Sequence, residues 1–144
     1  MNEIRALSPE KQAEFIASLD FDELEREMLE HEQVDCPVFH HFGPGVCIRE
    51  RHMPEGTLIL GHRHRVPHIN MIVKGMVVVI ASGEVNIFVA PHIFVGEADR
   101  KVIYPVEDTV WLNVIATNLT TVEEIEAAFI QKAPLLLENA PWPL

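Results

Sequence analysis

The sequence predicts a mainly β protein: one small antiparallel β-barrel with helices before and after it. Short apolar and β-branched stretches follow one another between residues 46 and 116, separated by Gly-, Pro- and Asp-containing turns. That spacing of strands and turns is typical of small sandwiches and barrels. Amphipathic helical patterns flank this region on both sides. At 144 residues the chain is long enough for one domain with a modest core.

Residues 1–36 are predicted to form an acidic helical arm. Ser8 is the expected N-cap of a first helix, and Asp20, with Glu23 as its capping-box partner, begins a second one. The arm holds eleven of the 22 acidic residues but three of the 11 Lys and Arg. We interpret the acidic side of the second helix as a solvated face. Its apolar side repeats at helical spacing through Phe21, Leu24 and Met28.

The barrel is predicted over residues 45–117, after an irregular connection over 33–45. Alternating or continuous apolar runs bounded by turn residues mark its strands. These runs cover residues 46–53, 56–65, 68–73, 76–81, 85–89, 93–95, 101–104 and 110–116.

Residues 118–144 are predicted to form a C-terminal helix and an apolar tail. Thr121 and Glu124 form a capping box, and Pro134 ends the helical pattern. The tail holds a run of three leucines and a tryptophan, which are costly to leave in water. We therefore expect the tail to dock on another subunit of a homo-oligomer.

His62, His64 and His68 form the most distinctive cluster in the chain. Strand alternation puts His62 and His64 on one face, and a bend at Pro67 lets His68 aim at the same point. Imidazole nitrogens converging at about 2.0–2.1 Å from one ion would make a metal site. Such ligands suit Zn, Fe, Ni or Cu, so a divalent transition metal is the expected cofactor. The alternative interpretation is three polar strand residues satisfied by other groups.

These histidines belong to a pattern that resembles the first signature of the cupin family. Gly56, five residues, His62-x-His64, three residues, His68, six residues and Gly75 match that signature, with His68 standing where the family usually has Glu. The resemblance covers about residues 45–117 and implies a jelly-roll β-barrel with a metal in its mouth. The overall pattern also resembles small single-domain cupins of bacteriophage genomes.

The second cupin signature departs from the family pattern. When Gly96 is aligned with the family's Pro, Lys101 stands at the position of the fourth ligand. A protonated Lys has no lone pair and cannot ligate a metal, so the four-ligand site is not intact. Three histidines could still hold an ion with open positions, or the metal has been lost and the pocket kept.

Positive charge is expected around the mouth of the barrel. Lys101 is one source, and Arg49 and Arg51 share a face that is either interior or a solvent-facing edge. Such charge favours a small carboxylate- or phosphate-bearing molecule, and it also raises the cost of a divalent ion. Glu97 and Lys101 are the candidate catalytic residues, although a loop position favours a plain solvated carboxylate for Glu97.

Composition narrows the classes of partner. The net charge of −11 argues against nucleic acid and anionic membrane surfaces, and the sequence has no run of about 18 apolar residues. The first residues lack a signal pattern, and two cysteines are too few for a disulfide framework, so we expect a cytoplasmic protein. Three hypotheses stay open: a metal-dependent enzyme acting on a small anion, a metal-free ligand-binding cupin, or a structural jelly-roll subunit of a larger assembly such as a virion.

Overall fold

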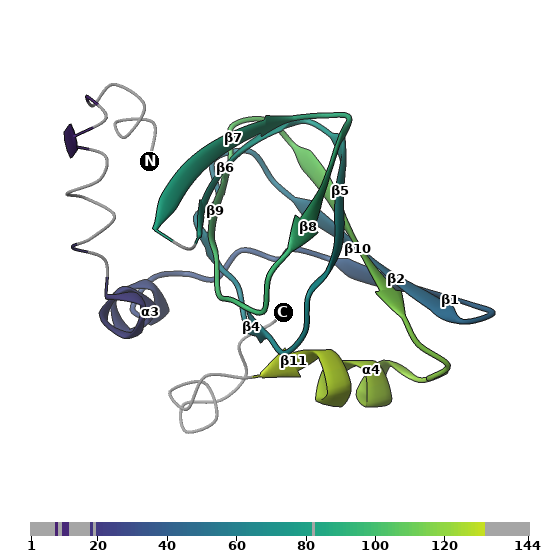
Figure 1. Ribbon diagram of the computed structural model, residues 1–144. Coiled ribbons are helices and arrows are strands. Elements are labelled where there is room, and N and C mark those ends of the chain that lie inside the picture. The colour runs from purple at the N-terminus through teal and green to yellow at the C-terminus, as the bar shows by residue number, and fades with distance from the viewer. Residues whose placement is uncertain (1–7, 9, 12–17, 19, 82, 132–144) are drawn as a thin grey trace.

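The computed structural model describes residues 8, 10, 11, 18, 20–81 and 83–131. Its centre is a barrel made of two antiparallel sheets that curve toward each other (Figure 1), which confirms the mainly β prediction. The five-stranded sheet runs in the order β1 (Val38–Gly43), β2 (Val46–Met53), β10 (Thr109–Ala116), β5 (His68–Lys74) and β8 (His92–Gly96). The four-stranded sheet runs β3 (Ile59–Leu60), β9 (Val102–Pro105), β6 (Met76–Ala81) and β7 (Glu84–Val89). A short pair, β4 (Arg63–His64) with β11 (Ile130–Gln131), lies at one end.

Helix α3 (Phe21–Leu29) begins where the sequence predicts. The Asp20 side chain accepts hydrogen bonds from the amides of Asp22 and Glu23. The apolar stripe of the helix packs on Leu60, Ile80 and Val102 of the four-stranded sheet. At Ser8, the hydroxyl accepts a hydrogen bond from the Lys11 amide (3.4 Å), but most of that first predicted helix lies outside the described residues.

Helix α4 (Val122–Phe129) closes one end of the barrel (Figure 1). Thr121 caps it by accepting from the Glu124 amide, as predicted. Ile125 and Phe129 are buried in a cluster with Cys47 and Ile115 of the five-stranded sheet. The predicted apolar tail lies outside the described residues. Neither described helix has the length and apolar content that crossing a bilayer requires.

Two local predictions are wrong. Residues 38–43 are not irregular: they form β1, which pairs with β2 along its whole length through a turn with Gly45 at φ 71°. An exposed edge strand needs no apolar alternation, so the sequence pattern does not mark it. Residues 56–65 do not form one strand, because the chain leaves the four-stranded sheet after β3 and enters the small pair at β4. The Gly61 amide donates to the Lys101 carbonyl (3.0 Å) at this crossing.

The inner face of the five-stranded sheet carries polar as well as apolar side chains, and its outer face is apolar over β10, β5 and β8. In β10, Trp111, Asn113 and Ile115 are buried inside, whereas Leu112 and Val114 alternate with them and are partly exposed outside. The middle of the barrel is filled by a core of apolar side chains, which leaves one end for polar groups. That core contains Met53, Ile59, Ile72, Val77, Val79, Ile103 and Trp111.

Candidate functional site

A small cavity of about 30 Å³ lies inside the barrel and is bounded by both sheets. This volume is enough for one or two water-sized groups. Its lining includes cations and imidazoles, which is unusual for the interior of so small a domain. The polar lining residues are Arg49, Arg51, His62, His64, Lys101, Trp111 and Asn113.

The two arginines lie two residues apart on β2, so both point into the barrel. Arg49 is 4% exposed; its Nε donates to His40 Nε2 (3.3 Å) and its Nη1 to Asn113 Oδ1 (3.4 Å). Burial lowers the pKa of Arg49 to about 10, so it is charged at neutral pH, and burial lowers the pKa of Arg51 as well. No carboxylate in the described part of the chain forms an ion pair with either one. Glu126 of α4 acts on Arg49 from longer range.

A hydrogen-bonded row continues from Arg49 across the inner face of the sheet. Asn113 lies opposite Arg49 on β10, and Asn70 lies opposite Asn113 on β5. Asn113 Nδ2 donates to Asn70 Oδ1 (2.7 Å), and Trp111 Nε1 donates to the same oxygen (3.0 Å). Sequence reasoning missed this row. The signal for it was a single Asn on the same face as Trp111 in an otherwise apolar strand.

Asn70 and His68 meet at Gly96 of β8, which faces His68 in the strand register. His68 Nδ1 donates to the Val66 carbonyl (3.0 Å), so the lone pair of the neutral ring is on Nε2. A Cβ built at Gly96 would lie 2.2 Å from Asn70 Nδ2 and 2.9 Å from His68 Nε2. Both nitrogens are buried, and neither has a well-formed hydrogen bond within the described residues. The missing side chain at Gly96 therefore makes room for these two polar groups.

The structure brings His64 and His68 together, and both pack against Phe129 of α4. The two imidazole centroids are 4.5 Å apart, and the His64 ring stacks on Phe129 at 4.6 Å. Burial, with the charges of His68, Lys101 and the two arginines, lowers the pKa of His64 to about 2, so this ring stays neutral. His62 is buried between β3 and β4 and reaches the cavity beside His64.

The three histidines do not fit a metal centre as they lie. Among the described residues, no three His, Cys, Asp or Glu side chains are grouped as one metal ion requires. The rings of His64 and His68 are edge to face, at 82°, and are held by contact with Phe129. The neighbouring cations oppose a divalent ion further. The three-histidine metal site therefore stays a prediction.

The two candidate catalytic residues lie in different surroundings. Lys101 is 6% exposed, lines the cavity and forms an ion pair with Asp99. Glu97 is exposed just after β8 and is not in the cavity lining. The charge of Lys101 is therefore compensated by its partner, while that of Arg49 and Arg51 is not. A catalytic role for Lys101 or Glu97 stays a prediction.

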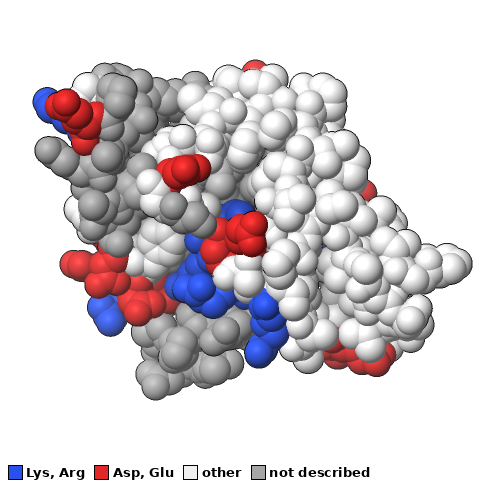
Figure 2. All heavy atoms as spheres, in the orientation of Figure 1, with Lys and Arg blue, Asp and Glu red and all other residues white. Residues whose placement is uncertain are grey.

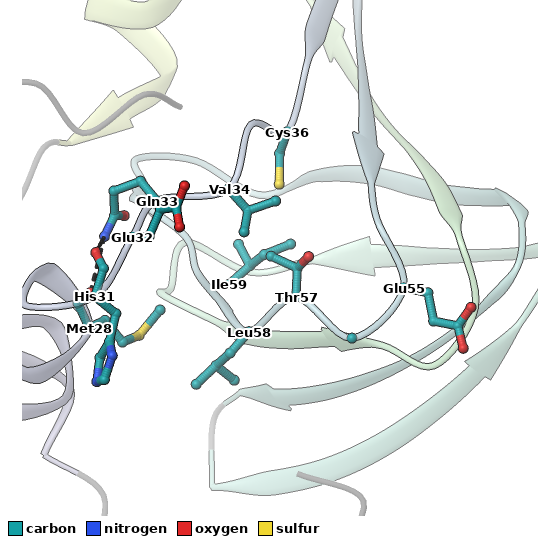
Figure 3. A pocket seen from close by; sticks show the side chains of 11 residues that line it. Met28, His31, Glu32, Gln33, Val34, Cys36, Glu55, Thr57, Leu58 and Ile59 are labelled. Atoms are coloured by element: carbon teal, nitrogen blue, oxygen red, sulfur yellow. Dashed lines mark hydrogen bonds between the residues drawn. The ribbon is translucent and has the colours of Figure 1, made fainter.

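The larger hollow, about 470 Å³, lies outside the barrel beside the end of α3 (Figure 3). The loop that forms one wall is held by Gln33, whose amide donates to the carbonyls of Met28 (3.1 Å) and His31 (2.8 Å). Among the described residues its lining contains two carboxylates, Glu32 and Glu55, and neither Lys nor Arg, so it is a poor place for an anion. The chemistry therefore points to the smaller, basic cavity.

Comparisons with known proteins identify the fold. A cupin superfamily protein from Desulfitobacterium hafniense superposes with a TM-score of 0.51 at 12% identity, over 64% of this chain and 86% of that one. A cupin 2 domain-containing protein from Halorhodospira halophila gives 0.50 at 13% identity, over 68% and 79%. The chain has the cupin fold. No protein-family model and no curated protein matches the sequence.

The cupin fold confirms the predicted β-barrel architecture, and identities this low show nothing further. Within this cupin barrel, the basic cavity lies toward the end closed by α4, because Arg49 also lies over the Phe129 ring, 5.8 Å from its centroid. The resemblance to bacteriophage cupins and the location in the cytoplasm stay predictions.

Proposed function

We propose that this cupin barrel binds a small anionic molecule, and that Arg49 and Arg51 neutralise its charge. One observation carries the proposal: the barrel encloses two guanidinium groups that have no carboxylate partner among the described residues. A buried charge without a counterion costs several kcal/mol, so buried charges are normally paired. A bound anion would supply the missing counterion.

The chemistry of the lining indicates which anions suit the site. A guanidinium presents its donors as a planar fork that matches a carboxylate or a phosphate. Asn113 and the imidazole of His62 add polar groups at the same cavity. A cavity of about 30 Å³ takes only one or two atoms of such a charged group and no large body. We therefore assign to this cavity the binding of a phosphate or carboxylate group.

Titration calorimetry with inorganic phosphate and with malonate tests this proposal. Arg51→Gln is the informative variant, because no side-chain hydrogen bond of Arg51 within the described residues is lost with it. Charge-assisted hydrogen bonds contribute about 1.5–3 kcal/mol, so the variant should bind the anion at least about tenfold more weakly. Arg63→Gln, an exposed arginine of β4, is the matched control and should bind like the wild type.

Two results would overturn the assignment. One is that neither phosphate nor malonate binds the wild-type protein. The other is that Arg51→Gln and Arg63→Gln bind these anions equally well.

A metal centre is the second candidate, favoured by two buried nitrogens. His64 Nδ1 and His68 Nε2 lack well-formed hydrogen bonds within the described residues, and uncoordinated buried nitrogens are costly. The imidazole rings would have to turn away from Phe129 to share an ion. Elemental analysis tests it: stoichiometric metal in the wild type that is absent from His64→Ala/His68→Ala supports the centre. Protein that neither contains nor takes up Zn²⁺ or Fe²⁺ rules it out.

A further inference from the structure

The hollow beside α3 is large enough to hold a small molecule. Its volume of about 470 Å³ lies within the range of about 300–1,000 Å³ that is usual for ligand pockets. Three parts of the chain form it: the end of α3, the loop over residues 31–36 and the segment over residues 55–59 (Figure 3). Among the described residues, none lines both this hollow and the basic cavity, so the two are separate sites.

Both walls of the hollow are fixed by hydrogen bonds. On one side, Gln33 holds the loop through the two carbonyls at the end of α3. On the other side, the Glu55 amide donates to Asp108 Oδ1 (2.8 Å), and the Gly56 amide donates to the Pro105 carbonyl (2.9 Å). These bonds tie the turn before β3 to the connection between β9 and β10. The hollow is therefore preformed, which spares a ligand the cost of ordering its walls.

The floor of the hollow is apolar. Met28 of α3, Val34 of the loop, and Leu58 and Ile59 beside β3 line it. Val34 is 50% exposed, so a ligand in the hollow would cover apolar surface that now faces water. Cys36 is a free thiol, 5% exposed, that points toward Val34 and Ile59 and makes no hydrogen bond within the described residues (Figure 3). An apolar body can cover this floor without leaving a strong donor or acceptor unpaired.

The rim of the hollow is acidic. Glu32 and Glu55 lie at opposite ends of it (Figure 3), both are exposed, and neither forms an ion pair within the described residues. In Figure 2, acidic side chains also gather over α3, the helix whose end borders the hollow. With a net charge of −11 on the whole chain, the field at this rim attracts a cation and repels an anion.

We propose that the hollow binds a small organic cation, an amine with an apolar body. The body covers the floor around Val34, and the ammonium group lies at the rim beside Glu32 or Glu55. A divalent metal ion fits poorly, because the described residues hold no group of three side chains that could ligate it. A neutral molecule of the same shape gains the floor but not the rim, so charge is the feature that distinguishes the proposed ligand.

Titration calorimetry with phenethylamine and phenethyl alcohol separates the floor from the rim. The two molecules share one apolar body, and only the amine is charged at neutral pH. The wild-type protein should bind the amine about fivefold more tightly than the alcohol, because ion pairs with exposed carboxylates are weak. Glu32→Gln/Glu55→Gln should lose this preference and bind the alcohol as the wild type does.

Two further variants test whether the effect is local. Glu27→Gln/Glu84→Gln removes the same charge from exposed positions outside the lining, and it should keep the preference for the amine. Thr57 is half-buried in the middle of the hollow (Figure 3), so the indole of Thr57→Trp should fill the space and abolish binding of both molecules. The circular dichroism spectrum of each variant should match that of the wild type.

Three results would overturn the proposal. The first is a wild-type protein that binds the amine no more tightly than the alcohol, or binds neither. The second is an equal loss of amine affinity in Glu32→Gln/Glu55→Gln and Glu27→Gln/Glu84→Gln, which would reflect net charge alone. The third is a folded Thr57→Trp variant that binds the amine like the wild type, which would place the binding elsewhere.

Discussion

Replacement of Glu25 by Gln tests how helix α3 is attached to the barrel. Arg100 Nη2 lies 2.8 Å from Glu25 Oε1, Nη1 donates to Oε2 (3.4 Å), and Nε donates to the Gly61 carbonyl (2.7 Å). Glu25 is 1% exposed and Arg100 is 7% exposed. This buried ion pair therefore ties α3 to the residue just before His62.

The expected loss in the free energy of unfolding follows from the burial of this ion pair. Removing one partner of a buried ion pair costs about 3–5 kcal/mol, because the other charge is left uncompensated. Asp22, 3.9 Å from Arg100 and mostly exposed, would compensate a little, so we expect the lower end, about 3 kcal/mol. In a domain of this size that corresponds to a fall in melting temperature of about 10 °C.

Urea unfolding, followed by circular dichroism, measures the loss of unfolding free energy in Glu25→Gln. Glu27→Gln, an exposed glutamate on the same helix, is the control and should change stability by less than about 0.5 kcal/mol. Glu25→Leu/Arg100→Met should lose less than Glu25→Gln, since it leaves no unpaired charge. A loss below about 1 kcal/mol in Glu25→Gln would refute the reasoning, because the pair would then behave as an exposed one.

Two more predictions concern the polar interior. Gly96→Ala places a Cβ 2.2 Å from Asn70 Nδ2, so we expect a loss of about 1–3 kcal/mol in the free energy of unfolding, measured by urea unfolding. A loss near zero would show that the Asn70 side chain moves aside without cost. His64 has a pKa of about 2 in the fold against 6.5 in the unfolded chain, so between these values the unfolded state binds more protons. The free energy of unfolding should thus fall as pH drops below about 6.5, by at most about 1.4 kcal/mol per pH unit from this group. The fall should be shallower in His64→Gln, and melting temperatures measured at several pH values test it. The prediction is contradicted if the melting temperature changes equally with pH in both proteins.

Local signals predicted the elements that carry their own start and stop residues. The cap at Asp20, the capping box at Thr121 and the alternation in 46–53 correspond to α3, α4 and β2. The sequence did not predict β1, because an exposed edge strand shows no alternation of apolar and polar residues. The break between β3 and β4 depends on contacts of Gly61 with residues 100 and 101, which are far away in the sequence.

The site illustrates what alternation can and cannot decide. Period 2 shows that Arg49 and Arg51 share a face, but not that this face is the interior. The structure decides it, because Asn113 and Trp111 of the neighbouring strand point to the same side. Likewise, alternation grouped His62 with His64, while the packing of His64 on Phe129 arises from a helix more than sixty residues away.

The melting temperature of Arg51→Met, compared with wild type with and without anion, tests the central claim most directly. Without phosphate or carboxylate, the variant should melt above the wild type, because removing an uncompensated charge stabilises the fold by about 1–3 kcal/mol. Phosphate or malonate at a hundredfold excess over the wild-type Kd should raise the stability of the wild type by about 2.7 kcal/mol, and that of a variant that binds tenfold more weakly by about 1.4 kcal/mol. A variant that melts below a wild-type protein that neither anion stabilises would contradict the account.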